Sequence, residues 1–313
     1  MRGAPVALAI LLLLAGCGRV PDTDLRPWPP RVTYAPLRHP FKDARLHLDT
    51  DSAAALYQRA NGAAWLTPIT SRPQARWING PPDLKPLPAV ASAARVQGTL
   101  PVLVAYNLPH RGCAKDQGAG TDQAYDRFIR QLTRRLGATR TAIIMEPDAV
   151  AADCFTPERA ALLKRNVLRL ARAGHHVYLD AGHSAWRSTG EMAERLLASG
   201  IQHAEGFAVN VSNRQTTDAS YRWGRELADL VGNREFVIDT SRNGLGPPPR
   251  NEWCNPRHQA LGRPPTTEVT RPGLAALLWI KRPGESDGVC GGETTYLFSP
   301  RQARLLIDNA TRP

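Results

Sequence analysis

The sequence predicts an α/β fold, namely a single distorted TIM-like (β/α) barrel of mostly parallel strands. Apolar runs of strand length alternate with amphipathic helices from residue 101 to residue 309. This alternation predicts a parallel sheet with right-handed crossovers. Six clear strands and one or two weaker ones favour a closed barrel, and an open, doubly wound sheet remains the alternative. Polar side chains follow nearly every strand, which is typical of the functional end of a barrel.

The first part of the chain is expected to lie outside the barrel. Met1 and Arg2 give a basic start, and an apolar stretch follows at residues 6–15. The stretch is too short to span a bilayer comfortably, so residues 1–16 are predicted to be an export signal.

The end of this signal carries a candidate lipidation site. Leu14-Ala15-Gly16-Cys17 resembles a bacterial lipobox, in which the cysteine becomes the lipidated first residue of the mature protein. An ordinary secretory signal is the alternative. Gly18 after the cysteine favours the outer membrane over the inner one. Residues 17–38 are rich in proline and predict a tether, and residues 39–313 are predicted to form the barrel domain.

Four further cysteines are an even number in an exported chain, which predicts disulfides. Three pairings are possible. The pairs Cys113–Cys154 and Cys254–Cys290 are favoured because each joins neighbouring segments. The close CxxC spacing of a zinc site does not occur in the sequence, so neither a metal nor a cofactor is expected.

The chain is strongly basic, with a formal net charge of +12 and a pI of about 10. Such a charge raises the question of a nucleic-acid partner. The basic residues are mostly arginine and are scattered, and the sequence has no zinc-finger spacing and no phosphate-binding glycine loop. A basic surface without a nucleic-acid partner is therefore the favoured interpretation, and a monomer is expected.

Each element follows from the spacing of its apolar residues and from its capping or breaking residues. Before residue 98 the signals are weaker and predict a helix at 52–60 and a strand at 75–78. Strands are then predicted at 101–106, 142–145, 176–180, 207–211, 236–239 and 277–281. Helices are predicted at 122–136, 156–174, 190–199, 218–231 and 300–309.

The residues that leave these strands are polar or charged, and their convergence predicts a site. They are Asn107, Glu146 with Asp148, Asp180, Asn210, Asp239 with Arg242, and Lys281 followed by Glu285 and Asp287. Aromatic residues accompany them, namely Trp77, Tyr106, Trp186 and Trp253. Flat rings beside carboxylates suit sugars. The chemistry they indicate is acetal hydrolysis, in which one carboxylic acid of raised pKa donates a proton and a second carboxylate handles the water.

Blocks of sequence along most of the chain resemble glycoside hydrolase family 6, which contains cellulases that cleave β-1,4-glucan with inversion. The similar blocks run in the same order from about Trp77 to Cys290, and they are 105–109, 144–148, 178–183, 210–213, 238–244, 253–256 and 281–288. The resemblance implies a distorted barrel of mostly parallel strands. It also implies two disulfides that agree with the favoured pairing.

The resemblance implies a role for each matching residue. Asp148 would be the general acid, Asp287 the carboxylate discussed as base, Asp180 a support of the acid's surroundings, and Tyr106 a contact to the distorted sugar. The glucose subsites would be lined by Trp77, His183, Trp186, Asn210, Trp253, Lys281 and Glu285. The implied partner is a β-glucan polysaccharide, and the shortness of the chain predicts endo action.

This chain departs from the family pattern in one loop. Family members usually have Arg-Asp-Cys where this chain has Arg111-Gly112-Cys113, and a serine of the next loop falls near Gly118. The missing aspartate normally raises the pKa of the acid. Two hypotheses follow: an inverting β-1,4-glucanase, or a catalytically impaired polysaccharide-binding lipoprotein on the same fold. Asp116, four residues past the gap, is a separate candidate for part of the missing role.

Overall fold

A computed structural model describes residues 32–250, 252–294 and 297–311. The predicted export signal and Cys17 lie outside these residues. The chain divides into two compact units, residues 1–33 and residues 34–313. All the helices and strands of the described part belong to the second unit, and none of these helices is long and apolar enough to cross a membrane.

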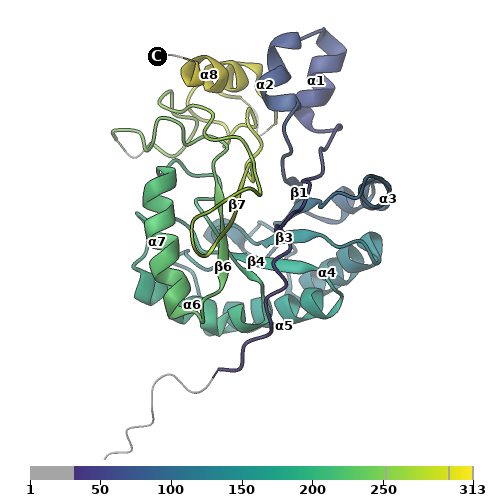
Figure 1. The fold of residues 1–313 in the computed structure, drawn as a ribbon, viewed down its shortest axis with the longest axis vertical. Coiled ribbons are helices and arrows are strands. Elements are labelled where there is room, and N and C mark those ends of the chain that lie inside the picture. The colour runs from purple at the N-terminus through teal and green to yellow at the C-terminus, as the bar shows by residue number, and fades with distance from the viewer. Residues whose placement is uncertain (1–31, 251, 295–296, 312–313) are drawn as a thin grey trace, which may run out of the picture. The chain divides into compact units, whose positions relative to one another are not determined.

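The core of the second unit is a parallel sheet whose seven described strands follow one another in sequence order (Figure 1). The strands are β1 (Arg76–Ile78), β2 (Val102–Ala105), β3 (Ala142–Met145), β4 (His176–Asp180), β5 (Gly206–Val209), β6 (Glu235–Asp239) and β7 (Leu274–Leu278). Alternate side chains point to opposite faces of a strand. In β3, Ile144 packs inside the curled sheet and Ile143 packs against the helices outside. Both faces are buried, and the strands accordingly read as continuous apolar runs.

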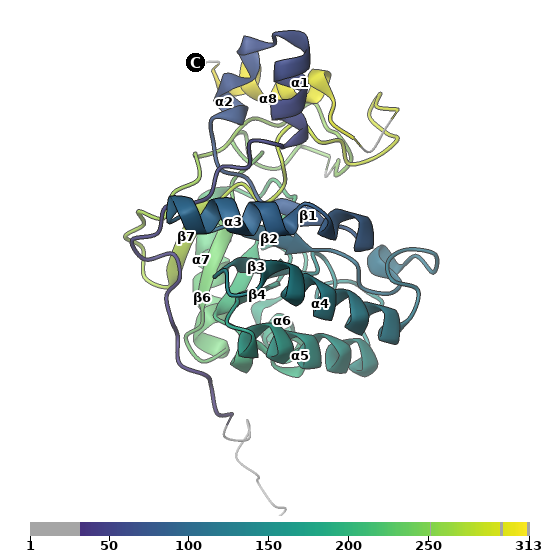
Figure 2. The same ribbon diagram turned by 90° about the vertical axis from the view of Figure 1, so that its right-hand side faces the viewer.

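Helices cover the outside of the sheet and one end of it. They are α1 (Ala53–Asn61), α2 (Thr67–Thr70), α3 (Leu87–Gln97), α4 (Asp122–Leu136), α5 (Pro157–Arg172), α6 (Thr189–Ala198), α7 (Thr217–Leu230) and α8 (Pro300–Ala310), with 3-10 turns η1 (Ala64–Leu66), η2 (Pro81–Leu84), η3 (Arg111–Cys113) and η4 (Ile201–His203). Figure 2 shows α3, α4 and α5 side by side, while α1, α2 and α8 pack on one another in a separate group. The helices α4 to α7 begin at Thr or Ser caps, whose side chains accept a backbone N–H of the first turn.

The curled sheet is joined into a distorted barrel between its first and last strands. The backbone N–H of Ala75 donates to the carbonyl of Trp279 at 2.9 Å. The indole Nε1 of Trp77 donates to the carbonyl of Ile280 at 2.8 Å. The predicted fold class, a distorted barrel of parallel strands, is confirmed.

Two differences from the predicted elements have physical reasons. The last strand is β7 at residues 274–278, whereas the sequence predicted 277–281. Residues 274–280 form one apolar run, so the pattern cannot place its end, and the backbone N–H groups of Ile280 and Lys281 bond to Asp239 instead of extending the strand. The helix α3 was missed because its alanine-rich sequence has a weak apolar stripe.

Residues 34–46 cross the amino-terminal ends of the strands as an ordered segment, which we call the strap. The N–H of Ala35 donates to Gln202 at 2.9 Å, Arg38 N donates to Glu205 at 2.9 Å, and the ring of Phe41 lies 5.5 Å from that of Tyr178 inside the barrel. Residues 34–38, which the sequence placed in the tether, therefore pack as part of the barrel unit.

Replacing Glu205 by glutamine should destabilise the barrel at neutral pH and flatten its loss of stability in acid. Burial alone would raise the pKa of Glu205, but His176 and Arg38 outweigh it and lower the pKa from 4.5 to about 2. A depressed pKa gives stability that is present above about 4.5 and is lost as the pH falls toward 2. Denaturant unfolding at several pH values measures this. We expect a loss of about 1.5–3 kcal/mol at pH 7, with no such loss in the exposed control Glu194→Gln. Equal acid sensitivity in wild type and Glu205→Gln would contradict the assignment.

Candidate active site

The carboxyl ends of β3 and β5 turn sharply, and this brings polar and acidic residues out of the sheet. Glu146 and Asp148 have φ angles of 53° and 70°, and Asn210 and Ser212 have φ angles of 69° and 58°. Residues other than glycine seldom adopt this left-handed region, and such strain concentrates at functional sites. Pro147 between the two acids prevents further strand pairing, as the sequence predicted.

Glu146 holds the neighbouring strand end in place. Its buried carboxyl accepts the N–H of Asn107 at 3.0 and 3.1 Å and that of Leu108 at 2.9 Å. Burial raises its pKa to about 7, although these two N–H groups oppose the shift. The sequence marked Glu146 as a strand-end residue without giving it a role. In the structure it positions the segment that follows Tyr106.

Asp148 and Asp180 form a close acidic pair. The backbone N–H of Asp148 donates to Asp180 Oδ2 at 2.7 Å, and that of Gly182 donates to the same oxygen at 3.2 Å. Burial raises the pKa of Asp148 to about 6, with Arg242 opposing the shift and Asp287 adding to it. Burial and the charge of Asp148 raise the pKa of Asp180 well above its ordinary value. A carboxyl that keeps its proton near neutral pH is suited to general acid catalysis.

Asp287 is held by positive charges on several sides. Arg242 Nη1 lies 2.8 and 2.9 Å from its two oxygens, Arg214 Nη2 lies 3.0 Å from Oδ2, and Lys281 Nζ lies 3.7 Å from Oδ1. Burial would raise the pKa of Asp287, but Arg242, Lys281 and Arg214 outweigh it and hold the pKa well below its usual range. Asp287 is therefore an anion that binds a proton weakly, and its charge favours the protonated form of Asp148.

Arg214 is the residue of this site that sequence reasoning missed. It is buried, donates to Gln259 Oε1 at 3.0 and 3.1 Å, and donates to the backbone carbonyl of Trp253 at 2.9 Å. It therefore connects Asp287 to the loop that carries Trp253. The available signal was its position directly after the strand-end block 210–213.

Aromatic rings lie beside the acidic residues. Trp77 and Tyr106 meet edge to face with ring centroids 5.2 Å apart, and the guanidinium of Arg111 lies 4.5 Å from the centre of the Tyr106 ring. Burial and the charge of Asp148 raise the pKa of Tyr106 to about 12, so its hydroxyl stays neutral. His183 and Trp186 pair at 5.5 Å in the loop after β4.

The other side chains predicted to contact sugar differ in their solvent exposure and in the bonds that they already make within the protein. Trp253 is 70% exposed and Trp186 is 37% exposed, so both indoles are accessible to a polysaccharide. Glu285 is paired with Arg282 at 3.2 Å. Asn210 is buried, and its amide bonds to the carbonyl of Asp239 at 2.9 Å and to the backbone of Gln215. The structure thus uses Asn210 to join strand ends, and its contact with sugar stays a prediction.

Both favoured disulfides are present, and both lie beside this site. Cys113 pairs with Cys154 and Cys254 with Cys290, with Cα separations of 5.7 and 6.1 Å. The first links the loop after β2 to the loop after β3. The second links the loop of Trp253 to the loop of Asp287. Across the described ranges, no three His, Cys, Asp or Glu side chains are arranged to hold a metal ion.

The loop that departs from the family pattern has two different glycines. Gly112 has a φ of +62°, is exposed, and has nothing within 4 Å of the position of an added Cβ. Gly118 has a φ of +82°, and an added Cβ would lie 1.9 Å from the carbonyl oxygen of Leu108. A serine therefore cannot replace Gly118 on this backbone, whereas Gly112 has room for a side chain. Asp116 is exposed.

Comparison with known proteins places this chain in a family. The sequence model of the family described as "Glycosyl hydrolases family 6" matches residues 39–304. Endoglucanase 1 of Streptomyces halstedii is 37% identical over 286 residues, covering 83% of this chain and 88% of that protein. Endoglucanase A of Cellulomonas fimi is 39% identical over 246 residues, covering 75% of this chain, and the matched region spans 54% of that longer protein.

A solved structure agrees with these sequence matches. The endoglucanase Cel6 from Mycobacterium tuberculosis, in complex with methyl-cellobiosyl-4-deoxy-4-thio-β-D-cellobioside, superposes with a TM-score of 0.82 and 39% identity, covering 88% of this chain and 100% of that one. The family resemblance read from the sequence is thereby confirmed. The chain belongs to the glycosyl hydrolases of family 6 and is an endoglucanase-like glycoside hydrolase.

Proposed function

We propose that this protein cleaves β-1,4-glucosidic bonds inside chains of cellulose or a related β-glucan, with inversion and with Asp148 as general acid. The observation that carries the proposal is the opposite protonation of two carboxyls at one site. Burial keeps the proton on Asp148 up to a pH of about 6, while Arg242, Lys281 and Arg214 keep Asp287 ionised. Acetal hydrolysis needs such a pair of a protonated acid and a carboxylate.

In the proposed reaction, Asp148 donates its proton to the leaving glycosidic oxygen while water attacks the anomeric carbon from the opposite side of the ring. Asp287 binds a proton weakly, so its proposed part is to orient the water, to stabilise positive charge and to pass the proton that the attacking water loses on to solvent. Tyr106, made rigid by Trp77 and Arg111, presses on the distorted sugar. The exposed indoles of Trp186 and Trp253 bind neighbouring glucose units.

The test is hydrolysis of a soluble β-1,4-glucan followed in two ways. Proton NMR of the first products should show the α-anomer, because a single displacement inverts the β-linkage. Viscosity should fall early relative to the release of reducing ends if cleavage is internal. β-anomeric products would contradict inversion, and a slow fall in viscosity with many new ends would contradict endo action.

A second candidate function is polysaccharide binding with little turnover. The observation that favours it is Gly112, which leaves this position without the carboxylate found in related enzymes. In either case we propose that the mature protein is exported and anchored to the bacterial cell envelope, in the outer membrane, by a lipid on Cys17. The intact mass of the native protein extracted from membranes tests the anchor, because an acylated Cys17 adds the mass of its lipid.

A further inference from the structure

Charges are divided unevenly between the two ends of the barrel. Each helix runs back against the strands, so its last turn lies near the amino ends of the strands, opposite the candidate active site. The first turns of α4, α5, α6 and α7 contain Asp122, Glu158, Glu191 and Asp218. The last turns of α3, α4 and α5 contain Arg95, Arg134, Arg135, Arg169 and Arg172. The end opposite the acidic pair is therefore rich in arginine beside α3, α4 and α5.

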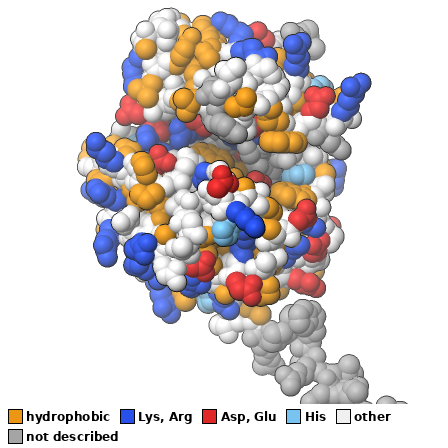
Figure 3. All heavy atoms as spheres, turned by 180° about the vertical axis from the view of Figure 1, so that it is seen from behind, with side chains coloured by type: hydrophobic (Ala, Val, Ile, Leu, Met, Phe, Trp, Pro, Cys, Tyr) orange, Lys and Arg blue, Asp and Glu red, His pale blue; other side chains and the backbone are white. Residues whose placement is uncertain are grey.

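Three of these cations, together with Arg140 between α4 and β3, are exposed and lack acidic neighbours, and we call the four the basic face. Arg134, Arg135, Arg140 and Arg172 have no carboxylate within 4.0 Å in the part of the chain that the structure describes. Figure 3 shows the molecule from the other side, where Lys, Arg, Asp and Glu side chains are interspersed around the centre of the view. A helix dipole favours cations at a last turn. It does not explain the lack of exposed acids among them.

Two acids at this end are buried and bonded inside the protein, whereas Asp43 of the strap and Asp229 of the last turn of α7 are exposed, with Asp229 paired to Arg225 at 2.7 Å. Glu205 is buried and bonds to Arg38 and His176, and Glu235 is buried and bonds to His39 at 2.8 Å. They do not neutralise the exposed arginines. The basic face thus presents uncompensated positive charge to solvent.

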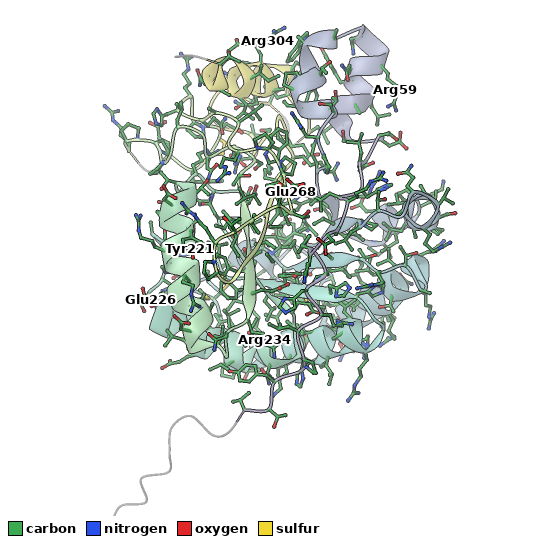
Figure 4. The ribbon with its side chains drawn as sticks, viewed as in Figure 1. Arg59, Tyr221, Glu226, Arg234, Glu268 and Arg304 are labelled. Atoms are coloured by element: carbon green, nitrogen blue, oxygen red, sulfur yellow. A yellow bond between two sulfur atoms is a disulfide. The ribbon has the colours of Figure 1, made fainter. Side chains whose placement is uncertain are left out.

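The chain enters the barrel unit at the same end. The strap begins at Tyr34, whose ring lies 5.0 Å from the guanidinium of Arg234, and Figure 4 shows Arg234 where the strap enters. Sixteen residues separate Cys17 from Tyr34, a length that reaches at most about 55 Å when extended. A lipid on Cys17 and the basic face could therefore meet one membrane at the same time.

We propose that the basic face binds the surface of an anionic lipid bilayer and turns the candidate active site away from the membrane. The proposal rests on the proposed export and lipid anchor for its biological setting, but the charge pattern stands without them. Phosphate headgroups complement a group of exposed arginines, and each basic residue near such a surface strengthens binding. The active site at the opposite end of the barrel would then face the polysaccharide.

The test uses the mature chain carrying Cys17→Ser, so that no acyl group contributes to binding. Co-sedimentation with phosphatidylcholine vesicles, with and without phosphatidylglycerol, measures the affinity. We expect binding only to the anionic vesicles, weakened by salt. The triple variant Arg134→Glu, Arg135→Glu, Arg172→Glu should bind at least about tenfold more weakly. A matched triple variant, Arg72→Glu, Arg127→Glu, Arg222→Glu, changes the net charge equally at exposed positions elsewhere and should bind like the parent.

Two results would overturn the proposal. One is equal weakening by both triple variants, which would mean that net charge alone is responsible. The other is capture of the protein by a soluble anionic polysaccharide or by nucleic acid with no binding to anionic vesicles. Glucan hydrolysis measured on the same variants separates this surface from the active site, and the intact mass of the native protein extracted from membranes tests the anchor separately.

Discussion

Replacing Asp148 by asparagine should lower glucan hydrolysis by about a hundred- to ten-thousand-fold, the usual contribution of a general acid. Asparagine keeps the shape of the side chain and the backbone N–H that bonds to Asp180 at 2.7 Å. The binding of cello-oligosaccharides should therefore persist while turnover is lost. Reducing-sugar release measures the first effect, and titration calorimetry with the inactive variant measures the second.

The pH dependence of wild-type activity tests the role of Asp148 in a second way, through its protonation. A general acid works only when it is protonated, so kcat/KM should fall as the pH rises through the pKa of Asp148, at about 6. Asp287 stays ionised over the working range because its pKa is held well below its usual range. The alkaline limb of the profile therefore reports the acidic pair of Asp148 and Asp180, as a property of the two together.

The variant Asp116→Asn is the matched control for Asp148→Asn, because it removes one carboxylate from a loop near the site without changing Asp148. Asp116 is exposed, and the charges that act on Asp148 are those of Arg242 and Asp287. Asp116→Asn should therefore leave turnover unchanged. A collapse of turnover in Asp116→Asn would show that this residue takes over the role left open at Gly112. Full activity in Asp148→Asn would exclude Asp148 as the acid.

The main architecture was predictable because it depends on local patterns. The strand 176–180 and the helix 122–136 were predicted with the bounds that the structure has. The helix is marked by Gly137 directly after it, and the strand by Gly174 before it and by Asp180 as its last residue. Asp148, Asp180 and Asp287 could be named because parallel strands deliver their carboxyl ends to one edge.

The parts that could not be predicted depend on contacts between distant segments. Arg214 acts on Asp287, which is 73 positions away in the chain, and nothing in the neighbouring sequence marks that pairing. Asn210 is polar and follows a strand, yet its amide is used to bond Asp239 and Gln215. A sequence pattern shows which polar residues lie at the carboxyl ends of the strands. It does not show which of them already form their hydrogen bonds with other groups of the protein.

The loop of Gly112 decides between the two candidate functions, and Gly112→Asp should raise turnover about tenfold or more. The position has room, since nothing lies within 4 Å of an added Cβ. Its φ of +62° is tolerated by aspartate better than by most residues. The loop is fixed by the disulfide between Cys113 and Cys154, and Arg111 next to it contacts the ring of Tyr106. A new carboxylate here would lie near the acidic site and favour the proton on Asp148.

The uncharged variant Gly112→Asn is the matched control, because it has the same shape and the same backbone demand. Reducing-sugar release and the alkaline limb of the pH profile should change in Gly112→Asp only, with the limb moving to higher pH as the new negative charge raises the pKa of Asp148. A silent wild type that gains activity in Gly112→Asp would mean that the native protein binds polysaccharide on an enzyme's fold. An active wild type with no gain in Gly112→Asp would contradict the expected effect and show that burial and Asp287 already keep Asp148 protonated well enough for catalysis.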